Sequence, residues 1–186
     1  MDGIEFEYWD SCIFLAFLQK ETHRPGEVQY VNDQVRKFGM GLVGITTSSI
    51  ALTEVFEARL NNDQVDFFRD MYSRTNFHFV DASTPICHLA SEIRSYYKIN
   101  KVNVNGVGLY PSAPDAIHVA SAITAQKQLK TPISLITFDS ENKAKGNDLA
   151  LTNLSGNIAN KYPLIICRPP VKNQQINIDD VENTKP

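Results

Sequence analysis

Four acidic residues have the types and spacing to bind a metal ion together. Asp10 follows the alternating segment "IEFEYW", and Asp139 follows the apolar segment "SLITF". If both segments are parallel strands, both carboxylates lie at the carboxyl edge of one sheet, where ligands bind in open α/β folds. Glu54 shares a predicted helical face with Ala51 and Ala58, and no Lys or Arg stands three or four residues away. An unpaired acid on a packing face is costly, so Glu54 needs a partner elsewhere in the chain.

Asp115, the fourth acid, begins a segment that reads as a helix with small or apolar residues on nearly every side, "PDAIHVASAITAQ". Ser112 and Asp115 have the spacing of a capping box, so a purely structural role is open to Asp115. Capping is also the commoner role of Asp10 taken alone. Four clustered carboxylates would raise their own pKa values or bind a cation. Oxygen ligands of this kind suit Mg²⁺ or Mn²⁺ rather than zinc.

The histidines and cysteines do not form a second metal pattern. The four histidines are scattered, and His118 is interpreted mainly as a packed core residue, with orientation of Asp115 as the alternative. The three cysteines are far apart and include no C-x-x-C pair, so neither a disulfide framework nor a zinc site is expected. This cysteine usage fits a reducing, cytoplasmic compartment.

The bulk composition indicates one globular domain. The chain has 186 residues, 42% of them hydrophobic and 21% charged. Its net charge of -3 argues against a general electrostatic grip on nucleic acid, but not against an enzyme that contacts a few phosphates. The apolar run "CIFLAFL" is too short to span a bilayer, which needs about 20 residues, so no membrane partner is expected.

The elements that must position the acids alternate between strand and helix. The strand cores "LVGI", "SLITF" and "LIIC" are apolar on both faces, which is typical of a parallel sheet covered on both sides. We therefore expect an α/β fold: a three-layer α/β/α sandwich with a Rossmann-like central parallel sheet of about four to five strands. The domain is expected to span residues 1–168, followed by a mobile polar tail, 169–186. Residues 99–113 are interpreted as a polar loop.

A match to the dinucleotide-binding fingerprint, "GMGLVG" at residues 39–44, is rejected on its context. The fingerprint must follow a strand and open a helix, because the helix N-terminus holds the pyrophosphate. Here the glycines follow a predicted helix and lead into a predicted strand. We interpret them as a helix stop and a loop.

The order of the acids resembles that of a known family. The segments "YWDSCIFLAFL", "SSIALTEVFEA", "APDAIHVASAI" and "LITFDSE" resemble, in this order, the four acidic motifs of PIN-domain nucleases. The resemblance covers most of the chain, and the order of the four segments makes it specific. Asp10 followed by Ser11 matches the first motif, Glu54 the second, Asp115 the third and Asp139 the fourth.

The resemblance implies a PIN-like fold and a metal-dependent endoribonuclease that hydrolyses phosphodiester bonds of single-stranded RNA with one or two Mg²⁺ or Mn²⁺ ions. The family includes the toxins of many bacterial toxin–antitoxin pairs, so an antitoxin protein and a second copy of the chain are expected partners. The expected metal ligands and catalytic residues are Asp10, Asp115, Asp139 and Glu54, with Ser11 in support.

Other readings stay open at the level of the sequence. Lys143 and Lys145 are candidates for holding a substrate phosphate, although most such charges belong to a solvated loop. The domain can instead be a catalytically silent module that binds RNA or protein. A phosphatase with a nucleophilic Asp is a weaker alternative, because it would need a second acid where Cys12 stands.

Overall fold

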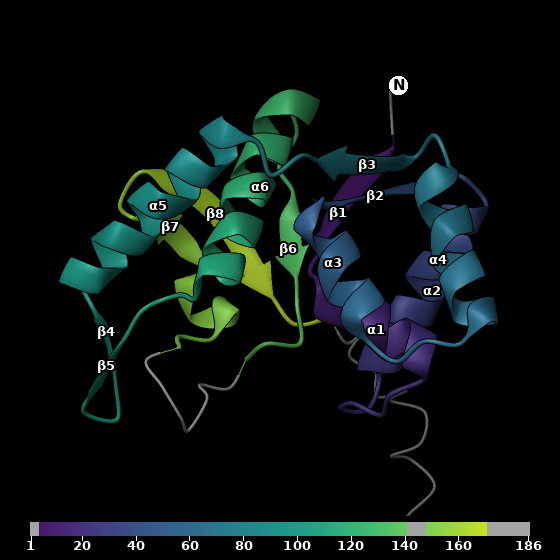
Figure 1. Cartoon of the computed structure of the whole chain (residues 1–186), viewed down its shortest axis with the longest axis horizontal. Coiled ribbons are helices and arrows are strands. Elements are labelled where there is room, and N and C mark those ends of the chain that lie inside the picture. Colours follow the sequence, from purple (N-terminus) through teal and green to yellow (C-terminus); the bar gives the residue numbers. More distant parts are fainter. Residues whose placement is uncertain (1–3, 141–147, 171–186) are drawn as a thin grey trace, which may run out of the picture.

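The computed structural model describes residues 4–140 and 148–170, in which a six-stranded sheet forms the centre. Its strands are β1 (Glu5–Trp9), β2 (Val43–Ser48), β3 (Phe77–Val80), β6 (Ser134–Ile136), β7 (Gly156–Ile158) and β8 (Tyr162–Cys167). They lie in the order β3-β2-β1-β6-β8-β7 (Figure 1). All neighbouring strands pair in parallel except β7, which runs antiparallel to β8 at one edge. The expected parallel sheet is confirmed, and β7 is an addition to it.

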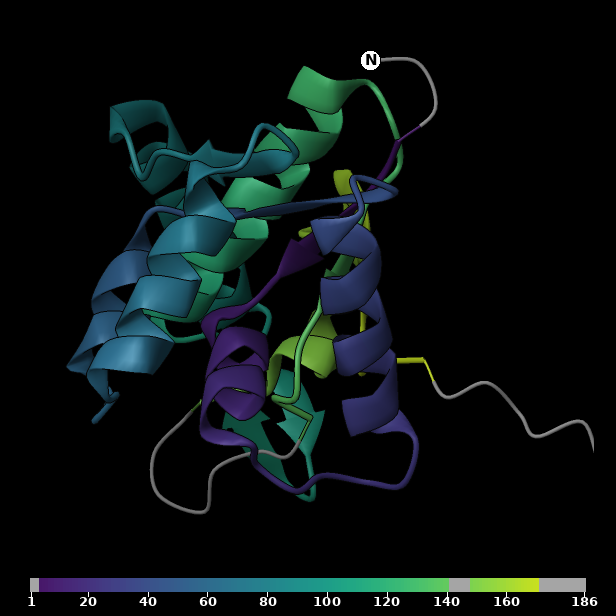
Figure 2. The same cartoon turned by 90° about the vertical axis from the view of Figure 1, so that its right-hand side faces the viewer.

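Helices cover both faces of the sheet. They are α1 (Ser11–Gln19), α2 (Glu27–Gly39), α3 (Ile50–Glu57), α4 (Asn62–Ser73), α5 (Thr84–Ile99) and α6 (Ala113–Leu129), with a 3₁₀ turn η1 (Leu151–Leu154). Figures 1 and 2 show α5 and α6 together on one side and α1 to α4 on the other. Two buried apolar clusters fill the layers, and the neighbours Tyr8 and Trp9 of β1 belong to opposite ones. The expected three-layer α/β/α sandwich is therefore confirmed.

A glycine lets β1 and β2 pack closely at the middle of the sheet. Phe6 pairs in register with Gly44, and a Cβ atom on Gly44 would lie 2.3 Å from the Phe6 ring. Only a residue without a side chain fits there. Because α2 ends at Gly39 and β2 begins at Val43, the glycine-rich segment joins a helix to a strand, as the rejection of a dinucleotide site required.

Helix α6 is buried along most of its length, which explains its lack of a polar face. It packs against α5 and contacts strands β2, β3, β6 and β8. Small residues allow these close approaches on several sides at once. Despite this apolar helix, residues 4–140 and 148–170 include no helix with the length and apolarity that a bilayer crossing requires. The buried residues of α6 include Ala116, Val119, Ala120, Ala122, Ile123 and Ala125.

The interpretation of residues 99–113 as a loop is wrong. They contain an antiparallel hairpin of β4 (Val102–Val104) and β5 (Val107–Leu109). Its turn residues Asn105 and Gly106 both have positive φ, 52° and 83°. An Asn-Gly pair favours such two-residue hairpin turns, so the signal was present in the sequence but the flanking strands are very short.

A buried ion pair joins α2 to the end of β8. The guanidinium of Arg168 makes two contacts with the buried Glu27 carboxylate, Nε to Oε1 at 2.6 Å and Nη2 to Oε2 at 2.7 Å. Arg168 Nη1 also donates to the carbonyl oxygen of Phe138 at 2.8 Å, one residue before Asp139. The hydrogen bonds from Arg168 lower the pKa of Glu27 against the opposing effect of burial. This pair therefore supports the segment that carries Asp139.

The stability that this pair contributes depends on pH. Since the folded-state pKa of Glu27 is lowered, the contribution is present above the ordinary value of 4.5 and is lost as pH falls through the folded pKa. Glu27→Gln should lower the free energy of unfolding by about 2 kcal/mol at neutral pH. The difference from wild type should shrink at acid pH in urea titrations. Glu92→Gln, which removes an exposed ion pair with Lys161, is the control and should change little. An equal loss at all pH values would contradict the proposed role of the charge.

Candidate metal centre

Asp10 is both the helix cap and a fixed, buried carboxylate. It follows β1 and is the N-cap of α1. Its Oδ1 accepts hydrogen bonds from the Ser11 backbone N–H at 2.8 Å and from the Ser11 hydroxyl at 3.3 Å. Its Oδ2 accepts from the Thr137 hydroxyl at 2.7 Å and from the Cys12 thiol at 3.0 Å. The same geometry of Asp10 thus suits both a helix cap and a metal ligand.

Thr137 connects Asp10 to Asp139. Its hydroxyl donates to Asp10 and accepts the Asp139 backbone N–H at 2.9 Å. Asp139 Oδ2 accepts the Leu151 backbone N–H at 2.9 Å. Because β1 and β6 are parallel neighbours, the residues that follow them meet at one edge of the sheet. Sequence reasoning missed Thr137, although a fully buried hydroxyl residue at the end of an apolar strand is a recognisable signal.

Glu54 finds its partner in His118. The imidazole Nε2 lies 2.8 Å from Glu54 Oε2 and 3.5 Å from Asp10 Oδ1, and Nδ1 lies 2.9 Å from the Tyr8 hydroxyl. His118 is 1% exposed, so the interpretation as a buried residue is correct. The acid to which His118 hydrogen-bonds is Glu54, whereas the sequence-based alternative named Asp115. The i+3 spacing on α6 therefore does not identify the acid that His118 contacts.

The charge state of His118 follows from its surroundings. Burial acts to lower the pKa of His118, but the hydrogen bond to Glu54 and the negative charges of Asp10, Glu54 and Asp115 outweigh it, so the net pKa is raised. A protonated imidazole among these carboxylates reduces their mutual repulsion.

Asp115 sits in the capping box that its spacing predicted. Its backbone N–H donates to the Ser112 hydroxyl oxygen at 3.2 Å, and its Oδ2 accepts from that hydroxyl at 2.5 Å and from the Ser112 backbone N–H at 3.3 Å. Burial raises the pKa of Asp115, and the charges of Asp10 and Asp139 add to the rise against the Ser112 hydrogen bond. The carboxylate therefore caps the helix and also feels the other two acids.

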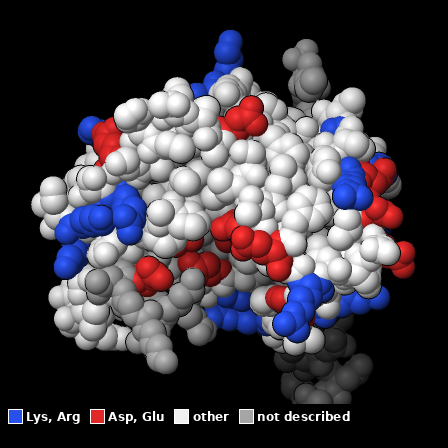
Figure 3. Space-filling view, in the orientation of Figure 1, with Lys and Arg blue, Asp and Glu red and all other residues white. Residues whose placement is uncertain are grey.

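The acids gather at one place but not as a single ring of four. Ligand atoms of Asp10, Glu54 and His118 lie within 4.8 Å of one another and could hold a metal ion. Asp115 and Asp139 stand outside this compact group; the charge of Asp115 acts on His118, and the charge of Asp139 acts on Asp115. Figure 3 shows acidic side chains near the middle of the face on which α3 and the N-terminal part of α6 lie. The structure thus brings Asp10 and Glu54 together and adds a histidine that was not proposed as a ligand.

The remaining sequence candidates have different placements. Ser11 contacts Asp10 through both its N–H and its hydroxyl. Lys143 and Lys145 lie outside the described residues. Burial, followed by the charge of Asp10, raises the pKa of the Cys12 thiol well above its ordinary value. Cys12 therefore stays a neutral donor to Asp10, which gives no support to the phosphatase alternative.

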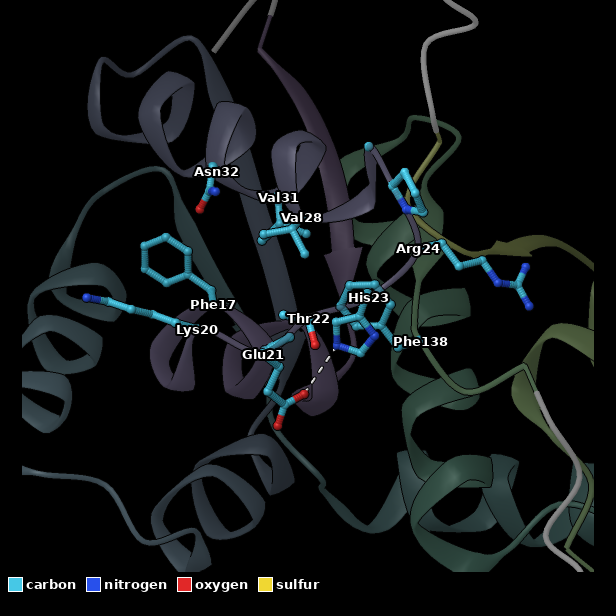
Figure 4. Close-up of a pocket in the computed structure, with 13 residues that line it drawn as sticks. Phe17, Lys20, Glu21, Thr22, His23, Arg24, Val28, Val31, Asn32 and Phe138 are labelled. Carbon is cyan, nitrogen blue, oxygen red and sulfur yellow. Dashed lines mark hydrogen bonds and ion pairs between the residues drawn. The ribbon is translucent and has the colours of Figure 1, made fainter.

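A separate cavity of about 340 Å³ lies beside the acidic edge, between the end of α1, the segment 20–26, α2 and Phe138. The His23 ring stacks on Phe138 with centroids 3.7 Å apart, and Figure 4 shows the two rings overlapping, with His23 joined to Glu21. None of the four predicted acids lines this cavity. It is therefore distinct from the candidate metal centre.

Comparison with known proteins addresses the fold. No protein-family model and no curated protein matches the sequence. The structure is similar to that of VapBC2 from Rickettsia felis bound to a DNA fragment from their promoter, with a TM-score of 0.52 and 14% identity over 88% of this chain and 98% of that chain. It is less similar to a toxin–antitoxin complex from Klebsiella pneumoniae (TM-score 0.45, 20% identity, 75% and 91% covered). FitAB bound to an IR36 DNA fragment also matches (TM-score 0.46, 15% identity, 87% and 94% covered).

The fold is PIN-like. The toxins of VapBC systems are PIN domains, and the match to the Rickettsia felis structure extends over nearly all of that chain. The mostly parallel sheet of this chain lies between two helical layers, which matches a PIN-like α/β/α fold. The fold that the four acidic motifs implied is therefore confirmed.

Asp115 offers a test that separates capping from charge. Asp115→Asn keeps a side-chain oxygen for the Ser112 N–H and removes one charge from the acidic edge. The melting temperature measured in EDTA should therefore stay the same or rise. Asp115→Ala loses the cap and should cost about 1 kcal/mol. If both variants lowered the melting temperature equally, the negative charge of Asp115 would not destabilise the metal-free site.

Proposed function

We propose that the protein is a metal-dependent endoribonuclease that hydrolyses phosphodiester bonds of single-stranded RNA with Mg²⁺ or Mn²⁺. The observation that carries this proposal is the compact group of Asp10, Glu54 and His118, held within 4.8 Å at the carboxyl edge of a PIN-like sheet. Asp115 and Asp139 add negative charge beside the group. A buried concentration of carboxylates is costly unless a cation lies among them.

The donor set fits a hard divalent cation. Asp10 and Glu54 offer carboxylate oxygens, which are the ligands that Mg²⁺ and Mn²⁺ prefer. The His118 nitrogen nearest to them is bonded to Glu54, so its main role is to orient that carboxylate. When bound, the ion would supply an acidified water and neutralise charge on the phosphate.

The side chains of this chain prepare the site in three ways. Thr137 and Ser11 fix both oxygens of Asp10, so that carboxylate is already in place before an ion arrives. Ser112 holds Asp115 at the first turn of α6. His118 orients Glu54 and, when protonated, offsets the negative charge of the acids. Preorganised groups of this kind need little rearrangement during a reaction.

We also propose that this protein is the toxin of a toxin–antitoxin pair. The similar solved structures are toxin–antitoxin complexes, which supports an antitoxin protein as a partner of this chain. An antitoxin would block activity by covering the acidic edge, most simply with a cationic side chain among the carboxylates. A homodimer is also proposed from the family resemblance.

Cleavage of RNA is the direct test. Incubated with single-stranded RNA and Mn²⁺, the wild-type protein should produce fragments with 5′-phosphate and 3′-hydroxyl ends, as end-labelling and gel electrophoresis would reveal. EDTA should stop the reaction, and Asp10→Asn should lower the rate by a factor of at least 100, since about 3 kcal/mol of electrostatic stabilisation is lost. Cleavage that persists in EDTA and in Asp10→Asn would end the proposal.

A catalytically silent binding module is the second candidate, and one observation favours it. His118 can carry a positive charge between Glu54 and Asp10, so the acidic edge is partly neutralised without any metal. A domain that had lost its metal could keep its fold in this way. The acids would then serve as caps and as partners of His118.

A metal titration separates the two candidates. If the centre binds Mn²⁺, saturating ion should raise the melting temperature, because a ligand at 100 times its Kd stabilises the folded state by about 2.7 kcal/mol. Glu54→Gln keeps a hydrogen-bond acceptor for His118 but should reduce the rise. The absence of any rise in the wild-type protein would favour the silent module.

A further inference from the structure

Next to the acidic edge, two cations share one aromatic ring. The guanidinium carbon of Arg94 lies 5.3 Å from the centroid of the Tyr110 ring, and Lys98 Nζ lies 5.7 Å from it. Arg94 and Lys98 come from α5, whereas Tyr110 follows β5. We call these three residues the Tyr110 patch. Figure 3 shows basic side chains over the C-terminal part of α5, on the face that also carries the acids.

The positive charge of this patch is not neutralised within the described chain. Arg94 and Lys98 are four residues apart on one helix, where like charges repel. In residues 4–140 and 148–170, no carboxylate forms an ion pair with either of them. The face of Tyr110 attracts and orders both cations but carries no net charge. Two ordered, uncompensated cations suit an external anion.

The patch is attached to the loop that holds the acidic edge. Tyr110 precedes Ser112 by two residues, so their Cα atoms are at most about 7 Å apart. Ser112 in turn holds Asp115. Arg94 Nε donates to the carbonyl oxygen of Pro111 at 3.2 Å, which ties α5 to the same loop. A strand of polyanion that reaches the acidic edge can therefore continue over the patch.

We infer that the Tyr110 patch binds backbone phosphates of the RNA strand on one side of the cleaved bond. This inference rests on the proposed function, and it names residues that hold the substrate rather than residues that react. The overall charge of -3 leaves no general attraction for RNA, so affinity must come from local groups such as these. The carboxylates repel a phosphate unless a metal is bound, whereas the patch attracts it in either state.

Lysines on tyrosine rings provide a matched pair of variants. Lys98→Ala removes an exposed cation of the patch. Lys127→Ala is the control, because Lys127 Nζ lies 5.3 Å from the Tyr162 ring near the other end of α6. The two lysines share an exposed position and a cation–ring contact, and they differ in their distance from the acidic edge. Twelve helical residues separate Asp115 from Lys127, which corresponds to about 18 Å.

The experiment measures the affinity of full-length protein for a fluorescent single-stranded RNA in EDTA, where cleavage is stopped, at several salt concentrations. Lys98→Ala should raise Kd about fivefold at low salt and lower the slope of log K against log salt by about 0.7, the value for one phosphate contact on a single strand. Lys127→Ala should match wild type. Arg94→Lys, which keeps the charge, should keep the slope.

Each outcome has a distinct meaning. If wild type cleaves RNA with Mn²⁺ but Lys98→Ala and Lys127→Ala bind RNA equally, the inference is overturned and the proposed function stands. If wild type does not cleave RNA, and Lys98→Ala but not Lys127→Ala lowers the affinity for RNA, the patch is supported. The result then also favours the catalytically silent binding module over the nuclease. An unchanged salt slope in Lys98→Ala, measured with a folded variant, would also overturn the inference.

Discussion

Mutual repulsion among carboxylates at one edge of the sheet is the constraint to which much of this structure responds. Strand order places Asp10 and Asp139 side by side, and α3 and α6 add Glu54 and Asp115. Such a group is stable only if each charge is hydrogen-bonded or balanced. Hydroxyl, thiol and backbone N–H donors surround Asp10, and His118 on α6, whose pKa is raised, hydrogen-bonds to Glu54. Burying these carboxylates is thus costly unless such donors accompany them.

The packing of α6 positions two of the charged groups, Asp115 and His118. Its small residues let it lie against the sheet and α5 at once, so its first turn is held rigidly. That turn carries Asp115 at one end of the site and, one turn on, His118 at its centre. A conventional amphipathic helix would leave one side in water and would hold these groups less firmly. The apolar body of α6 therefore anchors the helix, and the polar residues at its start are positioned by that anchoring.

The sequence predicted the layers and the placement of Asp10 and Asp139 after strands of the sheet, because strand periodicity and strand ends follow from local pattern. It did not predict the partners. The contacts of Glu54 with His118, of Thr137 with Asp10 and of Glu27 with Arg168 join residues that are 64, 127 and 141 positions apart. Such pairings depend on which strands become neighbours and on how helices rotate on the sheet, and no local rule determines either. The hairpin at Asn105 was missed for another reason: its strands are three residues long, too short to show a period.

The Thr137 hydroxyl links the two strand-end acids through one donated and one accepted hydrogen bond. The backbone N–H of Asp139 occupies an acceptor position on the Thr137 oxygen, so the single Thr137 proton is left to point at Asp10. Thr137 thus links the main chain of Asp139 to the side chain of Asp10. A shift of the backbone at the end of β6 would therefore alter the hydrogen bond that holds Asp10 Oδ2, at the start of α1.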